Sequence, residues 1–383
     1  MPSTPLQAWQ LRVTEAGMVC ALGLDAVTAC AAADAGLSRA GPLRSINPAS
    51  DSAMAGEPII GHALPCGRAD GFVGFAKALV LGRLALEDLT TRLRPPPVEP
   101  DGMVALYLAL SDRHLQDRAA TSPDSLDPGE AAPPPEQWPS ANWRGLATHV
   151  GERLSAEPVA RRLGIGGCRV LLGGHTALAR ALAEAASHLA AGRIARAYVA
   201  AIDSLIEPRE LQAAATVQKL KTVERAVGFI PGEAAVCLAV ESTEGADAGD
   251  ASIVVGGLGY RRCESGAAAF VGGRALAEAM HEAGAAWPTP GGIAAWDLAG
   301  DLNGDPRRAD EWGHCAIAWQ AVGAGALGVP EWIAASIGEC GTAGPAAQIA
   351  LLLHRARRGR RSPRPTLMPL SSDDGEKAAL VVH

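Results

Sequence analysis

A chain of 383 residues, of which 48% are hydrophobic and 20% charged, has the composition of a globular protein large enough for two or three core-forming units. The net charge of −7 and a single short arginine-rich run, Arg355 to Arg361, argue against nucleic-acid binding, and we interpret the run as a solvated helix end. No apolar stretch approaches ~18 residues, and no basic region precedes an apolar core at the N-terminus. We therefore expect no membrane span, no signal peptide and a cytoplasmic location.

The first third of the chain predicts strands and helices in alternation. A short strand precedes a helix over residues 26–35, which Asp25 caps. A second helix is predicted over residues 71–93, where three consecutive prolines stop it, and residues 103–110 have the pattern of a buried strand. A segment at about 119–142 is so rich in Pro, Ser, Asp and Glu that we expect an excursion loop there.

The middle of the chain has the pattern of a β-α-β unit. A strand over residues 169–172, a Gly-Gly turn, a helix over residues 176–191 and a strand over residues 195–202 predict a pair of parallel strands. A further strand is predicted at 234–241, and a second copy of the alternation follows it, with strands at 251–259, 294–298 and 378–382 and helices at 274–285, 307–322 and 346–355. This order predicts an α/β fold with two related halves, residues 1–245 and 246–383.

Four segments resemble motifs of the β-ketoacyl synthases, in the order of that family and along nearly the whole chain. Residues 228–235, Gly-Phe-Ile-Pro-Gly-Glu-Ala-Ala, are similar to the G-F-x-x-G-E-G-A signature, and residues 15–23 are similar to the opening strand and loop. Residues 190–201 resemble the G-x-A-D-x-A-L-A-G-G segment, and residues 341–344 stand where a G-A-A-G turn belongs. The resemblance implies a thiolase fold with a five-layered αβαβα core, and a dimer whose interface includes the strand before the nucleophile helix.

The same alignment indicates that the residues of the condensing reaction are absent. His175 stands at the position of the nucleophilic Cys, and Asn303 and Gly338 stand at the positions of the two catalytic histidines. Condensation needs a thiolate to take up the acyl chain and paired histidines to stabilise the developing negative charge. Loss of the whole set indicates a pseudoenzyme. Around the pocket the resemblance places Gly174, Phe229, Glu233 and Asp374.

His175 and Cys340 are the two candidate reactive side chains. His175 opens a helix whose positive end disfavours a charged imidazole, so we expect a neutral side chain, either a buried structural residue, which we favour, or a base. Cys340 lies in a loop that matches an active-site segment, and we favour a buried, inert thiol over a nucleophile. The eight cysteines include no C-x-x-C pair, so we expect reduced thiols, no metal and no cofactor.

Residues 301–312 are dense in charge. Asp305 precedes a proline and predicts a helix start, and Arg307 and Glu311 are spaced for an ion pair along that helix. Capping and a surface ion pair explain the run; the alternative is that Arg307, Glu311 and Trp312 form a partner interface, because Trp and Arg are favoured interface anchors. The run also resembles a motif of degenerate ketosynthase-like proteins from bacterial secretion-effector gene clusters.

We therefore predict a ketosynthase-like protein without the Cys-His-His triad that serves as a non-catalytic adaptor or accessory subunit, with bacterial secretion effectors as one class of cargo. We expect a homodimer, or a heterodimer with another thiolase-fold chain, that binds a protein such as an effector or an acyl carrier protein, and neither nucleic acid nor membrane. Two alternatives stay open. One is a chain-length-factor-like partner of an active β-ketoacyl synthase in fatty-acid or polyketide synthesis. The other is a divergent acyltransferase that uses Cys340 or His175, with Glu339 or Asp374 as orienting acids.

Overall fold

The computed structural model describes residues 9–43, 58–93, 103–112, 142–243, 251–263, 272–287 and 293–383. The expected excursion at about 119–142 falls almost entirely outside these residues, as does the predicted boundary between the halves at residue 245. The strands are β1 (Gln10–Cys20), β2 (Gly41–Pro42), β3 (Ile60–Gly61), β4 (Val104–Leu110), β5 (Ile165–Leu172), β6 (Arg196–Ser204), β7 (Glu233–Ser242), β8 (Ile253–Arg262), β9 (Ala295–Ala299), β10 (Ala326–Glu331), β11 (Thr366–Ser371) and β12 (Glu376–Val382). The α-helices are α1 (Ala26–Asp34), α2 (Gly74–Arg92), α4 (Asn142–Ala156), α5 (Pro158–Arg162), α6 (Thr176–Ala190), α7 (Pro208–Thr216), α8 (Arg274–Ala286), α9 (Pro306–Val322), α10 (Ala334–Ile337) and α11 (Ala343–Arg357).

The strands form two groups with the same internal order. The large sheet runs β10-β9-β11-β12-β8-β1-β7-β6-β4-β5, so each half reads 3-2-4-5-1 when its own five strands are numbered along the chain. The directions also match, because β4 is parallel to β5 and β6 as β9 is to β10 and β11, whereas β7 and β12 are antiparallel to their neighbours. The predicted neighbouring pair of β5 and β6 is wrong in one respect: both are parallel, but β4 lies between them.

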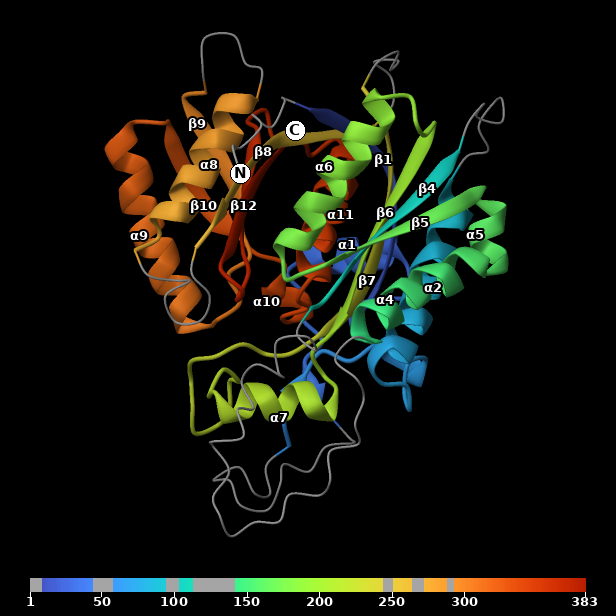
Figure 1. The fold of residues 1–383 in the computed structure, drawn as a ribbon. Coiled ribbons are helices and arrows are strands. Elements are labelled where there is room, and N and C mark those ends of the chain that lie inside the picture. The colour runs from blue at the N-terminus through green and yellow to red at the C-terminus, as the bar shows by residue number, and fades with distance from the viewer. Residues whose placement is uncertain are drawn as a thin grey trace.

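The helices divide into an inner layer and two outer layers. Figure 1 shows α6, α11 and α1 between the two groups of strands, with α2, α4 and α5 outside the first group and α8 and α9 outside the second. Strand β1 joins the groups, because it pairs with β7 along most of its length and with β8 through residues 10–13. The fold is thus mixed α/β with five layers, as expected. Among the described helices, none has the length and hydropathy needed to cross a bilayer.

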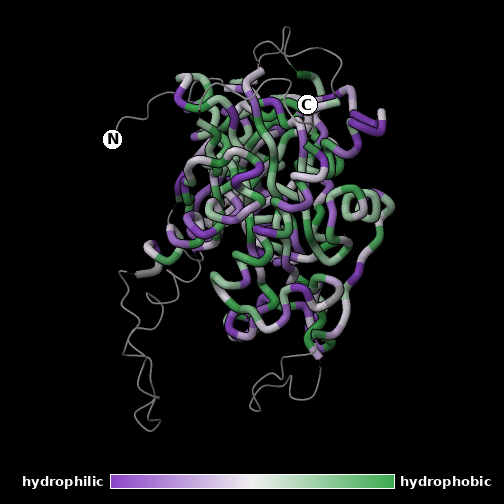
Figure 2. Tube along the Cα trace, turned by 90° about the vertical axis from the view of Figure 1, so that its right-hand side faces the viewer, coloured by the Kyte–Doolittle hydropathy of each residue, from purple (hydrophilic) through white to green (hydrophobic). Residues whose placement is uncertain are grey.

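Small residues allow the layers to approach closely. In β1, a Cβ added to Gly17 would lie 2.2 Å from the carbonyl oxygen of Ala85 in α2. In β8, a Cβ added to Gly259 would lie 1.8 Å from the carbonyl oxygen of Ala279 in α8, so both outer helices rest on a glycine of the corresponding strand. Figure 2 shows hydrophobic segments through the middle of the molecule. A core rich in Ala and Gly and poor in aromatic residues is therefore held by backbone proximity.

Helices α6 and α11 of the inner layer begin at the centre of the molecule. The N-terminus of each is capped by a residue from the other half of the chain. At the start of α6, the backbone N–H of Thr176 donates to the Ser372 hydroxyl at 3.1 Å, from the turn between β11 and β12. At the start of α11, the backbone N–H of Thr342 donates to the Asp203 carboxylate at 2.9 Å, from β6. Such caps satisfy amide groups that lack partners within a helix. Both helix N-termini are consequently fixed side by side.

Candidate functional site

A cavity of about 260 Å³ lies at the N-terminal end of α6, between the two halves and the short helix α7. Seven of the residues singled out from the sequence line it, namely Gly174, His175, Phe229, Asn303, Asp305, Glu339 and Asp374. Three others, Glu233, Gly338 and Cys340, do not. The cavity therefore has the expected location, and its lining separates the predicted site residues into two groups.

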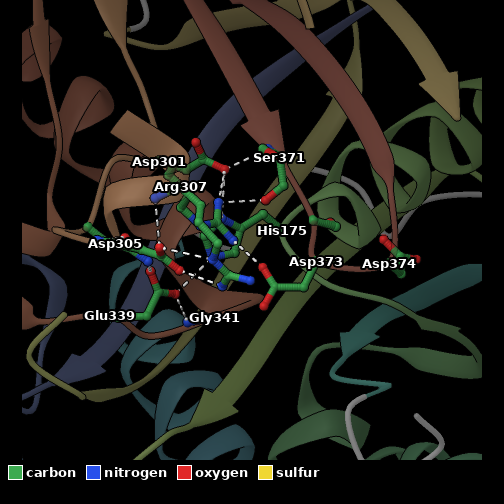
Figure 3. A network of polar contacts seen from close by, with 12 residues as sticks. His175, Asp301, Asp305, Arg307, Glu339, Gly341, Ser371, Asp373 and Asp374 are labelled. Carbon is green, nitrogen blue, oxygen red and sulfur yellow. Dashed lines mark hydrogen bonds and ion pairs between the residues drawn. The ribbon is translucent and has the colours of Figure 1, made fainter. Parts of the chain in front are cut away.

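His175 is the central side chain of the site and is held at both ring nitrogens. Nδ1 lies 2.8 Å from Oδ2 of Asp301, and Nε2 lies 2.8 Å from Oε1 of Glu339. The residue is 4% exposed. Figure 3 shows the imidazole, which comes from the first half of the chain, among side chains of the second half that include Asp301 and Glu339. Each ring nitrogen faces a carboxylate oxygen, which fits an imidazolium that donates two hydrogen bonds, and Nη1 of Arg308 also lies 3.2 Å from Nδ1.

The charge state of His175 differs from the sequence-based expectation. Burial acts to lower its pKa, but the Glu339 carboxylate and the hydrogen bonds with Asp301 and Glu339 outweigh burial and the nearby Arg308, and raise the pKa to about 9. The predicted neutral imidazole is therefore wrong. The helix N-terminus does disfavour a cation, but its effect is at most about 2 kcal/mol, and two carboxylates in direct contact dominate it.

Arg308, on the first turn of α9, is the second buried cation and was not identified from the sequence. Its Nη1 donates to Oδ2 of Asp301 at 2.8 Å and to the Ser371 carbonyl at 2.6 Å, and its Nη2 lies 3.3 Å from Asp373. Oδ2 of Asp301 thus accepts from three groups, since the Ser371 N–H also donates to it at 2.6 Å. Burial acts to raise the pKa of Asp301, but Arg308 and His175 hold it below its usual range.

Glu339 closes the cluster on the side of α11. Its carboxylate accepts from the Gly341 N–H at 2.6 Å and from the amide of Asn303, in addition to His175. Burial acts to raise its pKa, but the charge of His175 and these hydrogen bonds lower the pKa to about 2. Asn303 therefore serves as a hydrogen-bond donor to Glu339.

The position of Gly338 has no room for a histidine. Its φ of +76° lies in a region that favours glycine. A Cβ built there would lie 2.7 Å from Cδ2 of His62 and 2.8 Å from the carbonyl oxygen of Ile230. His62 is 1% exposed, and burial lowers its pKa to about 4, so it is a neutral side chain that fills this space. No sequence pattern predicted this contact, because His62 is remote from every motif.

Cys340 is buried beside the cluster and has no access to the cavity. It is 1% exposed, and its Sγ lies 3.4 Å from the Ile337 carbonyl oxygen. Burial, followed by the charges of nearby acidic groups, raises the pKa of its thiol well above the usual range. Because the thiolate is the reactive form of cysteine, these surroundings favour the inert thiol over the nucleophile. Among the described residues, no cysteine lines the cavity.

Glu233 does not line the pocket, although the resemblance implied that it would, and instead forms contacts that join neighbouring elements of the fold. Its carboxylate forms a buried ion pair with Lys77 at 2.9 Å and accepts from the backbone N–H of Leu64 at 2.9 Å. The Ser204 hydroxyl donates to it at 3.1 Å. The glutamate of the signature motif therefore ties β7 to α2 and to the end of β6.

The charged run at residues 301–312 contributes side chains to the site and does not form the predicted exposed ion pair. Asp305 caps α9 as predicted, since its carboxylate accepts from the Arg307 N–H at 2.9 Å. The predicted pair of Arg307 with Glu311 is wrong: Arg307 binds Asp305 at 2.7 Å, and Glu311 is 2% exposed and binds the buried Lys377 at 2.8 Å. Trp312 packs against the outer core of the second half. Of the three interface candidates, Glu311 is buried, whereas Trp312 and Arg307, with 39% of its side chain exposed, are both partly exposed.

Comparison with known proteins agrees with this geometry at the level of fold. No known family profile matches the chain, and no curated protein sequence matches it. Solved structures do match. The ishigamide ketosynthase/chain length factor superposes with a TM-score of 0.63 and 17% identity, over 97% of this chain and 99% of that chain. The AntDE:AntF complex is a type II PKS acyl-carrier protein in complex with its ketosynthase bound to the hexaketide. It superposes with a TM-score of 0.70 and 14% identity, over 98% of this chain and 99% of that chain. The chain has the ketosynthase fold.

A third solved structure, that of a ketosynthase domain, agrees with these two. The oxazolomycin ketosynthase domain OzmH KS7 from Streptomyces albus JA3453 gives a TM-score of 0.69 and 14% identity, over 98% of this chain and 75% of that chain. The expected thiolase fold is therefore confirmed, whereas identities of this size leave the chemistry to be argued from the side chains.

The chemistry open to this ketosynthase-fold site follows from its charges. The buried cations His175 and Arg308 are matched by Asp301, Glu339 and Asp373, and Asp373 also binds Lys219. Every one of these carboxylates already accepts from N–H donors, and among the described residues no group of three or more His, Cys, Asp or Glu side chains is arranged to hold a metal. The charges of the cluster are thus balanced within one hydrogen-bonded network.

Proposed function

We propose that this protein is a non-condensing member of the ketosynthase-fold proteins that acts by binding a protein partner. The observation that carries the proposal is the position of His175 between the carboxylates of Asp301 and Glu339 at the N-terminus of α6, where the resemblance places the nucleophile. An imidazolium that donates both N–H groups to Asp301 and Glu339 has no lone pair with which to attack an acyl thioester or to take up a proton.

The surroundings of His175 support the same conclusion. Gly338 cannot be replaced by a histidine without displacing His62, and the Cys340 thiol is buried away from the cavity. The divergent acyltransferase is disfavoured for these reasons, because Glu339, its proposed orienting acid, is already bonded to His175 and Asn303. The protein therefore retains the scaffold of the fold without the groups that handle charge in condensation.

Strand β5 supports a partner of the same fold. It is the last strand of the sheet at this end, and no described strand pairs with its outer edge. An unpaired edge offers a row of N–H and C=O groups to another chain. Four apolar side chains of this strand, Cys168, Val170, Leu171 and Leu172, are only partly buried. We accordingly assign β5 to the interface of a homodimer, or of a heterodimer with a second thiolase-fold chain.

A second candidate function is that of a chain-length-factor-like subunit beside an active ketosynthase. It is favoured by the cavity of about 260 Å³ next to α6 and by the similarity to a structure that contains a ketosynthase and a chain length factor. In this case the third component is an acyl carrier protein, as in the AntDE:AntF complex. In the first candidate it is an unrelated protein such as a secretion effector.

The edge of β5 can be altered without disturbing the monomer. A Cβ at Gly167 meets no atom within 4 Å, so Gly167→Asp adds a carboxylate to the edge alone. Gly313, on the exposed side of α9, is equally open and provides the control Gly313→Asp. The assay is light scattering coupled to size exclusion, followed by affinity capture of the full chain from native lysate and identification of bound proteins.

The expected result is a dimer for the wild type and for Gly313→Asp, and a monomer for Gly167→Asp. Capture of an intact ketosynthase together with an acyl carrier protein selects the second candidate, and capture of an effector selects the first. A monomeric wild type that captures no thiolase-fold chain, carrier protein or effector contradicts the proposal.

A further inference from the structure

A second cavity, of about 410 Å³, lies at the C-terminal end of α11 and shares no lining residue with the His175 site. Four arginines line it: Arg355, Arg360, Arg361 and Arg364. Part of the arginine-rich run that we interpreted as a solvated helix end therefore lines a cavity. Apolar side chains of the sheet and of α11, among them Leu298, Leu352 and Val382, form part of the same lining.

The arginines outnumber the side-chain carboxylates that neutralise them. Arg355 binds Asp34 at 2.8 Å and Glu331 at 2.6 Å, and Arg360 also binds Asp34. Arg364 binds Asp297 at 2.7 Å. Three carboxylates thus face four guanidinium groups. Within the described part of the chain, Arg361 forms no ion pair, so a positive charge faces the cavity.

A second polar group in the lining also lacks a partner. The ring nitrogen Nδ1 of His383 is buried and has no described partner within ordinary hydrogen-bond geometry, although the Arg364 backbone lies close to the ring. The position of His383 is fixed, because its backbone N–H and carbonyl pair with Val254 at the start of β8. Buried polar atoms are normally satisfied, so Nδ1 of His383 and the guanidinium of Arg361 are two groups in one cavity that remain available to a ligand.

We propose that this cavity binds a small organic molecule that carries a phosphate group. Guanidinium groups match phosphate oxygens in bidentate geometry, and the apolar part of the lining suits the organic portion. A concave site of about 410 Å³ lies within the range typical of small-molecule pockets. That concavity favours a small ligand over an acidic protein surface, which would need a broad exposed face.

Adenosine monophosphate is the probe, and the measurement is its dissociation constant by isothermal titration calorimetry on the full chain. Loss of one charged hydrogen-bonding contact weakens binding about ten- to a hundredfold. We expect this increase for Arg361→Gln. Arg358 belongs to the same run, is exposed and does not line the cavity, so Arg358→Gln is the matched control and is expected to bind as the wild type does.

The ligand class is tested by two further titrations. Adenosine without phosphate is expected to bind at least tenfold more weakly than the monophosphate. A glutamate-rich peptide is expected not to compete with it. The proposal is overturned if the monophosphate does not bind at millimolar concentration, if Arg358→Gln weakens binding as much as Arg361→Gln, or if only the acidic peptide binds. These outcomes are independent of dimer formation through β5.

Discussion

Replacement of His175 by glutamine tests the ion cluster most informatively. The variant retains a side chain of similar size that can donate one hydrogen bond, but it removes the positive charge between Asp301 and Glu339. Both carboxylates then depend on Arg308 and on neutral donors. Removal of one partner from a buried ion pair typically costs about 3–5 kcal/mol, because the remaining charge is left without compensation.

The pKa of His175 gives a second estimate of the same energy. An increase from 6.5 to about 9 corresponds to about 3 kcal/mol at ~1.4 kcal/mol per pKa unit. Because the folded protein holds this proton more tightly than the unfolded chain does, the stabilisation is fully present below pH 6.5 and is lost as the pH rises through about 9. The lowered pKa of Glu339 arises from the same pair and adds no separate contribution.

The assay is urea unfolding of wild type and His175→Gln at several pH values between about 6 and 10. We expect the wild type to be about 3 kcal/mol more stable near pH 6 and this difference to shrink steadily above pH 7. His149, whose side chain is 61% exposed, provides the control His149→Gln, which is expected to change the free energy of unfolding by less than ~0.5 kcal/mol. A difference that does not vary with pH would refute a buried imidazolium.

The remaining predictions concern residues around the cluster. Glu311→Gln is expected to lower the free energy of unfolding by about 3–5 kcal/mol, because Lys377 is fully buried beside Glu311. Arg307→Gln is expected to lower it by less than about 1 kcal/mol, because Arg307 is partly exposed. Equal values for the two variants in urea unfolding would contradict the assignment of Glu311 to the interior. Cys340 is expected to resist alkylation in the folded protein and to react after unfolding, as followed by peptide mass spectrometry, and rapid native labelling would contradict its burial. Gly338→His is expected to destabilise the protein by more than about 2 kcal/mol, since it clashes with His62, and a stability equal to that of the wild type would disprove the clash.

Much of the fold could be predicted because its elements have strong periodicity. The helix predicted over residues 176–191 is α6 at Thr176–Ala190, and the strand predicted over 234–241 is β7 at Glu233–Ser242. Two strands of the second half, β10 and β11, were missed, because each contains a proline and β10 is also largely exposed. Proline weakens a strand pattern, and the pairing with β9, and for β11 also with β12, shows that both strands belong to the sheet.

The site was predicted less well, for a different physical reason. The sequence located His175 and Asn303 through single motifs, but the charge of His175 depends on Asp301 and Glu339, which are 126 and 164 residues away. A local argument from the helix end gave the wrong protonation state. Arg308 was missed for the same reason, since a surface helix and a buried salt bridge give the same local pattern of charges.

The central claim is that no group in the His175 cavity takes up an acyl chain. The direct measurement is the intact mass of the protein after incubation with acyl thioesters of several chain lengths, together with detection of condensation products in the presence of a malonyl thioester. We predict an unchanged mass and no product at any chain length. An acyl adduct mapped to His175 or Cys340, or a condensation product that disappears in His175→Ala, would contradict the account.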